Sequence, residues 1–319
     1  MTIPIINSHN SWSPLQEVWL GDVYPAHWYD HLPAETRDAF YHLTQITQED
    51  LVKIQRTIES FGVTVRRPVY ENLDQFIQES GQLVKPQICP RDQFVTLGNT
   101  LVAHQWHTAA WQPVLDEYAQ HTDCTVVLTD NPHLNGANVV RRGRDLIIDT
   151  PCPEAMCNDF LQDFRVQLIN NGGHVDGCLA TLKPGLLMAN QYYPLYEETF
   201  PGWTKIVLDL PEFHTHIKHN KPDHNGKWWL PSLNNNRSFN EHVLKHATDW
   251  VGNYTETYFD VNCLVIDEAN VIMLGYNPAL EKTLSQHGIT VHWVSFRTRT
   301  FWDGGLHCLT VDIRRSSTM

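Results

Sequence analysis

A cysteine near the C-terminal end of the chain is the best candidate for a catalytic nucleophile. Cys308 follows the pair Gly304-Gly305 and directly precedes the alternating apolar run Leu309–Ile313. This pattern predicts a loop that enters a strand, where glycine lets a substrate approach the backbone closely. Most free cysteines are inert packing residues. A catalytic role therefore requires a nearby base that favours the thiolate and a group that orients this base.

A histidine and a carboxylate stand two residues apart in the middle of the chain. His174 and Asp176 precede an apolar run that ends at Lys183-Pro184-Gly185. On an extended segment, side chains two residues apart point to the same face, so we expect these two side by side. A single His-x-Asp pair is typical of a surface turn, and the pair gains meaning only together with other segments.

Two further polar turns precede apolar runs. Asp92 precedes the run Phe94–Leu97, and the turn Asn135-Gly136-Ala137-Asn138 precedes two strand-like runs that are typical of a hairpin. Either turn alone is typical of the entry to a strand. The order of the four segments along the chain is the informative feature.

These segments, in this order, resemble the guanidino-group-modifying enzymes, and within them the glycine amidinotransferase branch. The stretch Gly304–Arg315 is similar to the Gly-Gly-Phe-His-Cys-Trp-Thr-Cys-Asp-Val-Arg-Arg signature of that branch. His174-Val175-Asp176 resembles its His-Ile-Asp segment, and Pro90-Arg91-Asp92 resembles its Pro-Arg-Asp turn. Asn7–Gly21 is similar to its opening strand, so the resemblance covers nearly the whole chain.

The resemblance implies a role for each of these side chains. Cys308 is expected to be the nucleophile, His174 the general acid/base, and Asp92 and Asp176 the carboxylates that clamp a guanidinium. A guanidinium stays protonated up to a pKa above about 12, so a pocket for it needs counter-charges with matching acceptor geometry. The further substrate-binding positions implied by the resemblance are Asn138, Tyr193, Thr255, Glu256 and His307.

The turn at Asn135 departs from the family pattern. The family carries Asp-Ala-Ala-Asp there, and the first acid orients the catalytic histidine, whereas this chain has Asn135 and Asn138. An asparagine still accepts a hydrogen bond from an imidazole N–H. We therefore count Asn135 among the catalytic residues, as the group that orients His174.

The pocket for the tail of the substrate also departs from the family. The family arginine that binds a substrate carboxylate falls near Tyr193, and the paired serines fall near Thr255-Glu256, where Glu256 would repel a carboxylate. The tail either lacks a carboxylate or is bound by an arginine elsewhere. The candidates are Arg237, Arg297 and Arg299. The identities of donor and acceptor stay open.

Composition limits the class of protein. The chain has 319 residues, 42% of them hydrophobic, with 11 Trp, which is compatible with one large domain or two small ones. With the resemblance over nearly the whole chain, we expect a single domain over residues 1–319. No window approaches a membrane span, no signal pattern opens the chain, and seven cysteines without a CxxC pair indicate reduced thiols. These features predict a cytoplasmic protein. The formal net charge of −13 argues against a nucleic-acid partner, and we interpret Arg141-Arg142-Gly143-Arg144 as a solvated hairpin turn.

Repeated helix-glycine-strand patterns indicate an α/β fold. One helix is expected to begin near Thr47 and Asp50 and to end at Gly62, and another to begin at Asn277-Pro278 and to end at Gly288. Phe160, Phe164 and Leu168 suggest a third helix before His174. The resemblance implies an α/β propeller of repeated ββαβ units with five-fold pseudosymmetry around a central active-site channel.

A histidine-rich segment in the middle of the chain could suggest a metal site. It contains His214, His216, His219 and His224. Their spacing fits no common zinc pattern, and Lys218 and Lys221 would oppose a cation. We interpret the segment as a loop that covers the pocket, and we expect no metal and no cofactor.

Three functions are compatible with these residues. The first is transfer of an amidino group from arginine or an arginine-like donor to an amine acceptor, through a covalent amidino-cysteine. The second is hydrolysis or deimination of a guanidino compound by the same Cys, His and carboxylates. The third is binding of a guanidino ligand without catalysis, suggested by Asn135 and Asn138. The expected partners are a small-molecule guanidino donor and an amine acceptor. The sequence is compatible with a homodimer and leaves the oligomeric state open.

Overall fold

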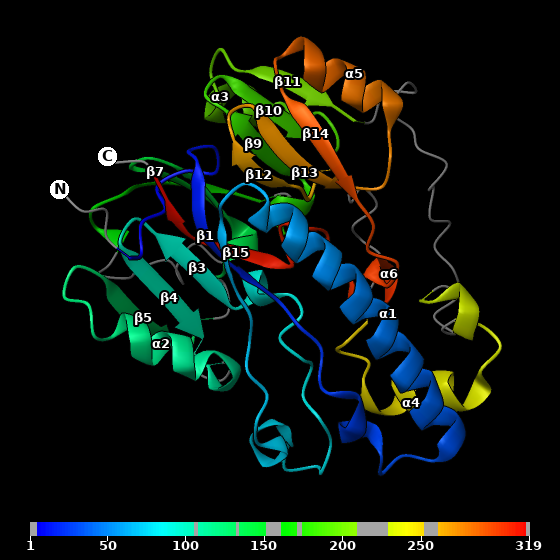
Figure 1. Ribbon diagram of the computed structural model, residues 1–319. Coiled ribbons are helices and arrows are strands. Elements are labelled where there is room, and N and C mark those ends of the chain that lie inside the picture. Colours follow the sequence, from blue (N-terminus) through cyan, green and yellow to red (C-terminus); the bar gives the residue numbers. More distant parts are fainter. Residues whose placement is uncertain are drawn as a thin grey trace.

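The computed structural model describes residues 5–104, 108–131, 134–150, 161–170, 174–208, 229–251 and 261–316, which form five three-stranded sheets (Figure 1). The strands are β1 (Leu15–Leu20), β2 (Thr64–Arg66), β3 (Phe94–Leu97), β4 (Thr100–His104), β5 (Thr125–Thr129), β6 (Val139–Arg142), β7 (Asp145–Asp149), β8 (Arg165–Ile169), β9 (Leu179–Lys183), β10 (Leu186–Ala189), β11 (Thr204–Val207), β12 (Leu264–Asp267), β13 (Asn270–Leu274), β14 (Thr290–Val294) and β15 (Thr310–Arg315). The α-helices are α1 (Ala34–Glu59), α2 (Gln112–Tyr118), α3 (Leu195–Thr199), α4 (Arg237–His246), α5 (Pro278–Gln286) and α6 (Arg299–Trp302). Short 3₁₀ turns are η1 (Ala26–Tyr29), η2 (Leu73–Phe76), η3 (Pro90–Asp92), η5 (Ala109–Trp111), η6 (Gly136–Asn138), η9 (Val175–Gly177) and η11 (Pro231–Leu233).

The five sheets share one topology. The middle strands β1, β4, β7, β10 and β13 each pair antiparallel with one neighbour and parallel with the other. A parallel pair needs a long crossover, and α1, α2, α3 and α5 lie in four of these crossovers. The fifth crossover, from β7 to β8, runs partly outside the described residues. The repeated ββαβ units confirm the expected α/β propeller-like architecture.

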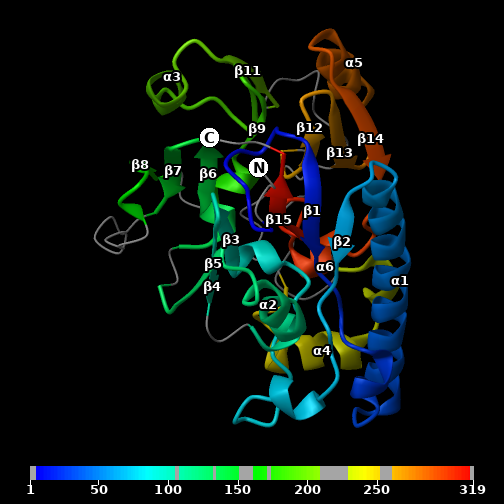
Figure 2. The same cartoon turned by 60° about the vertical axis from the view of Figure 1, so that its left-hand side comes forward.

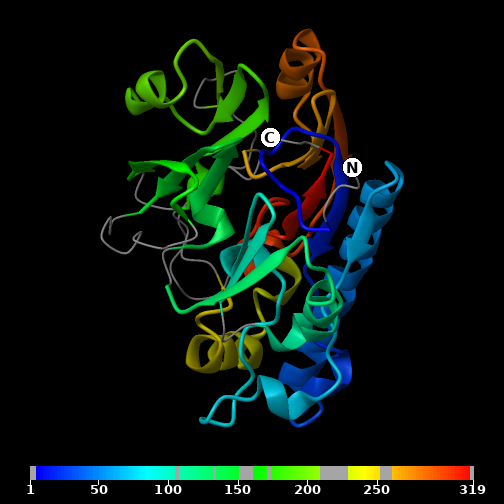
Figure 3. The same cartoon turned by 90° about the vertical axis from the view of Figure 1, so that its left-hand side faces the viewer.

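The two ends of the chain complete one of the sheets. β15 pairs antiparallel with β1, and Asn7 N donates to Ile313 O at 2.9 Å. β15, the last strand in the sequence, therefore completes the sheet that contains β1 and β2. Figures 2 and 3 show the sheets around a common centre, with the red β15 near the middle. This arrangement puts Cys308, which precedes β15, close to the centre.

Helix α1 begins earlier than its sequence predicts. It starts at Ala34, directly after Pro33, so Thr47 and Asp50 lie inside the helix and the expected start there is wrong. Both polar side chains are satisfied within the fold, because Thr47 Oγ1 donates to Leu43 O and Asp50 binds Arg297. A polar pair in a helix resembles a cap when its tertiary partners are unknown.

The other two expected helices have different outcomes. α5 begins after Asn277, whose side chain accepts a hydrogen bond from Leu280 N, so this helix is confirmed. The third is wrong for Leu168, which lies in strand β8 and pairs with Ile148 of β7, while Phe160 is outside the described residues. Three apolar residues at helical spacing cannot distinguish a short helix from a strand.

The hairpin between β6 and β7 is confirmed, but one of its arginines is not solvated. Gly143 forms the turn with φ 66°. Arg141 is only 4% exposed and points into the centre of the molecule, where it binds Asp312. The expectation of a solvated turn, which rested on charge alone, is therefore wrong for Arg141. Across the described residues no helix is both long enough and apolar enough to span a bilayer.

Candidate active site

Five turns meet at one end of the central axis, each directly before the first strand of its sheet. Cys308 precedes β15, Asp92 ends η3 before β3, and Asn135 precedes η6 and β6. His174 and Asp176 lie at η9 before β9, and Asn262 precedes β12. η6 packs against both η3 and η9. The repeated topology thus brings together residues that lie as far apart in sequence as Asp92 and Cys308.

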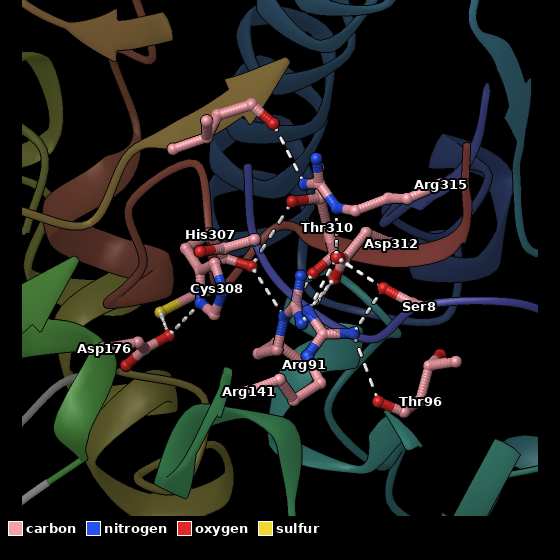
Figure 4. A network of polar contacts seen from close by, with 12 residues as sticks. Ser8, Arg91, Thr96, Arg141, Asp176, His307, Cys308, Thr310, Asp312 and Arg315 are labelled. Carbon is pink, nitrogen blue, oxygen red and sulfur yellow. Dashed lines mark hydrogen bonds and ion pairs between the residues drawn. The ribbon is translucent and has the colours of Figure 1, made fainter. Parts of the chain in front are cut away.

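Cys308 is buried between a donor and an acceptor. Its side chain is 2% exposed. Asn262 Nδ2 donates a hydrogen bond to Cys308 Sγ at 3.0 Å, and the thiol can donate to Asp176 Oδ2 at 3.4 Å (Figure 4). The sulfur therefore has a carboxylate next to it. Such a carboxylate can hold a bound cation within reach of the sulfur for attack.

Asn262 was missed by the sequence analysis, although it holds the nucleophile turn. Its Oδ1 accepts from Cys308 N at 3.0 Å, and its backbone carbonyl accepts from Leu306 N at 2.9 Å. A Cβ on Gly305 would lie 2.5 Å from Asn262 Oδ1, so this close approach needs glycine. A weak signal existed, because Asn262 precedes an apolar run as Asp92 and Asn135 do.

Asp176 joins the nucleophile to its neighbour His307. His307 Nδ1 lies 2.8 Å from Asp176 Oδ2. Burial raises the pKa of Asp176, but the hydrogen bond from His307 and the charges of His307, His174 and Arg91 outweigh burial and hold this pKa below its ordinary value. Asp176 Oδ1 is buried without a hydrogen-bond partner among the described residues. It is an available acceptor for a cationic ligand.

Asp92 and His174 face each other across the site. His174 Nδ1 lies 3.8 Å from Asp92 Oδ1, which also lacks a hydrogen bond from any described residue. Burial raises the pKa of Asp92, while the charges of His174 and Lys85 oppose this shift. The His174 side chain is 40% exposed, so it is accessible to solvent and to a leaving group.

The expected strand through His174 and Asp176 is wrong. His174 is extended, but Asp176 lies in the 3₁₀ turn η9, and β9 starts only at Leu179. The two side chains consequently diverge, one toward Asp92 and the other toward His307 and Cys308. Two turns thus contribute carboxylates to opposite sides of one site.

A buried ionic cluster supports the turns from beneath (Figure 4). Asp312 binds Arg91 at 2.9 Å, Arg141 at 2.6 Å and Arg315 at 2.7 Å. Arg91 also donates through Nε to Thr310 O at 2.7 Å, and its backbone N donates to Cys308 O at 3.3 Å. Arg91 therefore fastens the nucleophile turn to the turn that carries the next residue, Asp92.

Asn135 and Asn138 lie in the same group of turns. Asn135 Oδ1 accepts a hydrogen bond from Asn138 N at 3.1 Å and caps η6. The two residues are 6% and 9% exposed. Their expected roles toward His174 and the substrate stay predictions.

Comparison with known proteins finds amidinotransferases among the similar chains. No protein-family model matches the chain. Inosamine-phosphate amidinotransferase 1 of Streptomyces griseus is 22% identical and covers 98% of both chains. The mitochondrial glycine amidinotransferase of Xenopus tropicalis is 21% identical, over 98% of this chain and 83% of that protein. The chain is thus similar to amidinotransferases over nearly its whole length.

Solved structures agree with this amidinotransferase fold. SxtG, an amidinotransferase of Microseira wollei, superposes with a TM-score of 0.72 at 20% identity over 98% of both chains. The Streptomyces griseus enzyme superposes with a TM-score of 0.69 at 18% identity, over 99% of this chain and 98% of that chain. DDAH of Pseudomonas aeruginosa shares the fold more distantly, with a TM-score of 0.53 at 12% identity over 93% of this chain and 99% of that one.

Several residues expected in the substrate pocket lie elsewhere or outside the described residues. Tyr193 packs edge-to-face on Tyr196 at 5.2 Å, within an apolar cluster of the β9–β11 unit. Arg237 is bound to Glu241 on the surface, and Arg297 binds Glu49 and Asp50 of α1. Two of the three arginines suggested for a substrate tail are thus bound by carboxylates of α4 and α1. Thr255 and Glu256 lie outside the described residues.

The histidine-rich segment lies outside the part of the chain that the structure describes. His214, His216, His219 and His224 all lie outside the described residues. Within the described part of the chain, no group of three His, Cys, Asp or Glu side chains is arranged to hold a metal ion.

Proposed function

We propose that this protein transfers an amidino group from a guanidino donor to an amine acceptor through a covalent intermediate on Cys308. The observation that carries the proposal is the Cys308 sulfur 3.4 Å from one of two carboxylates that each keep a buried oxygen without a hydrogen bond, with His174 beside the second carboxylate. The similarity to amidinotransferases supports transfer over the alternatives.

In the first half-reaction, the two carboxylates bind the donor. Asp92 Oδ1 and Asp176 Oδ1 accept hydrogen bonds from the guanidinium, whose planar fork matches two separated carboxylates. The bound cation also compensates the repulsion between Asp176 and a thiolate at Cys308. The thiolate attacks the guanidinium carbon, a C–S bond forms, and the C–N bond to the donor breaks. Protonated His174 gives its proton to the departing amine.

In the second half-reaction, an acceptor amine replaces the departed one. Neutral His174 takes a proton from this amine as it attacks the amidino carbon. The C–S bond breaks, the new guanidino product leaves, and Cys308 returns as a thiolate. The same residues thus serve both half-reactions, as expected when the leaving group and the acceptor are both amines.

The substrates and setting are finer proposals. The names of two relatives point to amines that carry an anionic group, glycine and an inosamine phosphate. We propose arginine or a related compound as donor, a cytoplasmic location that keeps Cys308 reduced, a single catalytic domain, and a homodimer as the assembly to test.

Intact-mass measurement tests this function. The protein is quenched during incubation with arginine and with other guanidino compounds, and Cys308→Ala is the control. We expect the wild type alone to gain the mass of one amidino group, and the adduct to disappear when an acceptor amine is added. An adduct of the whole substrate less ammonia would instead mean deimination. Loss of the adduct in water without an amine would mean hydrolysis, and no adduct with any donor would favour binding without catalysis.

A further inference from the structure

Lys85 lies on a firmly held segment next to the candidate site. Tyr24 Oη donates to Val84 O at 3.1 Å on one side of it. On the other side Gln87 N donates to Tyr70 Oη at 2.8 Å. Pro86, Gln87 and Ile88 are buried, and Lys85 itself is partly buried. Only its side chain is free to adjust, so the position of the ammonium group is limited.

Short contacts connect this ammonium group to the nucleophile turn. Lys85 Nζ lies 3.5 Å from Trp302 O, and Cys89 Sγ lies 3.7 Å from the same oxygen. A Cβ placed on Gly304 would be 2.7 Å from Cys89 Sγ and 3.3 Å from Cys308 Cβ. The ammonium group thus lies near the nucleophile turn, where Cys89 and Trp302 contact it.

The charge of Lys85 acts on Asp92, one of the two carboxylates proposed to hold the guanidinium, and no ion pair with a described residue neutralises it. It acts on Asp92 and on the thiol of Cys89, opposing the effect of burial on the pKa of both groups. Among the described residues no carboxylate forms an ion pair with Lys85, and its hydrogen bond to Trp302 O is long. Asp303, held at φ 51°, is a negative charge that acts on the same two groups in the opposite sense. A partly buried ammonium group with so little compensation favours an anionic ligand.

We propose that Lys85 binds an anionic group, a carboxylate or a phosphate, on one of the two substrates, while Asp92 and Asp176 hold the guanidinium. The inference rests on the proposed function. It assigns the tail-binding role to a residue far in sequence from Tyr193, Arg237 and Arg297. A lysine suits this role because its compact charge binds either kind of anion.

Matched substrate pairs test the proposal and identify which substrate carries the anion. Arginine is compared with agmatine as donor, and glycine with methylamine as acceptor, because each pair differs by one carboxylate. We expect Lys85→Gln to lower kcat/KM about 10- to 100-fold for the carboxylate-bearing member of one pair, the effect of one charged hydrogen bond. For the member of the same pair that lacks the carboxylate, we expect kcat/KM to be unchanged. Lys53→Gln, an exposed lysine on α1 with a 62% exposed side chain, is the control. Equal losses within both pairs, or no loss, would overturn the proposal.

A second measurement needs no substrate and separates failure of Lys85 from failure of the transferase function. Cys308 is alkylated with anionic iodoacetate and with neutral iodoacetamide, and the ratio of the two rates is compared. We expect this ratio to fall in Lys85→Gln and to be preserved in Lys85→Arg and Lys53→Gln. An unchanged ratio in Lys85→Gln would overturn the anion subsite even in an active enzyme. A fallen ratio in a protein that forms no amidino adduct would sink the transferase function and keep the subsite.

Discussion

At the scale of single residues, the site depends on how each buried polar atom around Cys308 is satisfied. Asn262 uses its Nδ2 for Cys308 Sγ at 3.0 Å and for Asp176 O at 3.3 Å, and its Oδ1 for Cys308 N at 3.0 Å. Asp176 and Asp92 each keep one oxygen without a hydrogen bond from the described residues. The fold thus gives the side chain of Asn262, which holds the nucleophile, its hydrogen-bond partners. It leaves one oxygen each of Asp92 and Asp176, the carboxylates proposed to hold the substrate, available to a ligand.

Two variants of Asn262 separate positioning from support of the thiolate. Asn262→Asp keeps an acceptor for Cys308 N but removes the N–H that faces the sulfur, whereas Asn262→Ala removes both. We expect both to slow iodoacetamide alkylation of Cys308 and formation of the amidino adduct about 10-fold or more, with Asn262→Asp at least as slow because it adds a negative charge. Only Asn262→Ala leaves the buried Cys308 N unsatisfied, at about 1–3 kcal/mol of unfolding free energy.

The control for these variants is Asn270→Ala, which removes an amide that binds Asp267 in the β12–β13 hairpin. It is expected to leave alkylation unchanged. Alkylation of Asn262→Asp at the wild-type rate would show that the Asn262 N–H does not act on the sulfur.

At the scale of elements, the packing of α4 on α1 creates a pH-dependent contact. His242 of α4 stands edge-to-face on Phe40 of α1 at 5.6 Å. Burial, and then the charges of His246, His31 and Lys245, lower the pKa of His242 to about 4. The folded protein therefore keeps this imidazole neutral at a pH where the unfolded chain, with an ordinary pKa near ~6.5, already binds a proton.

The sign of this shift predicts acid sensitivity of the helix pair. Between pH 6.5 and the folded pKa the unfolded chain binds more protons, so the free energy of unfolding should fall as pH is lowered through this window. His242→Gln cannot titrate, and we expect its loss of stability from pH 7 to pH 5 to be smaller than in the wild type. Urea unfolding at both pH values measures this difference. His292→Gln, which removes a histidine from β14, is the control, and equal losses in His242→Gln and the wild type would contradict the assignment.

At the scale of the whole molecule, the ionic cluster at the centre joins separate sheets. Asp312 of β15 meets Arg141 of β6, Arg91 of η3 and the Ser8 hydroxyl near the start of the chain. Burial raises the pKa of Asp312, but the surrounding arginines hold it well below its ordinary value. One carboxylate therefore compensates cations from several units of the ring.

Removing this carboxylate is expected to destabilise the protein strongly. Asp312→Asn keeps the shape of the side chain but leaves three buried guanidinium groups without their shared counter-charge, so we expect a loss of about 3–5 kcal/mol of unfolding free energy. Glu241→Gln removes one partner of the exposed Arg237–Glu241 pair, which solvent screens, and should cost far less. Urea unfolding of both variants at pH 7 compares the two. Similar small losses would show that the cluster is not needed for stability.

The sequence by itself determined the residue types and the local turns. The Gly-Gly-x-His-Cys stretch, the polar turns at Asp92 and Asn135, the helix that begins after Asn277, and the β6–β7 hairpin all follow from short-range patterns. Capping, turn chemistry and strand alternation act within a few residues of the chain, so these features could be read without knowledge of the fold. The resemblance to the amidinotransferases also depended on them.

Only the tertiary structure decided which of these turns meet and where each side chain points. The closure of the β1 sheet by β15 puts Cys308 beside Asn262 and Asp176, and burial of Arg141 under the site reverses its expected place on the surface. Lys85 carries no local signature and Asn262 only a weak one, because their roles arise from atoms contributed by other turns. Contacts of this kind depend on ring closure and on burial, which a pattern within one segment cannot contain.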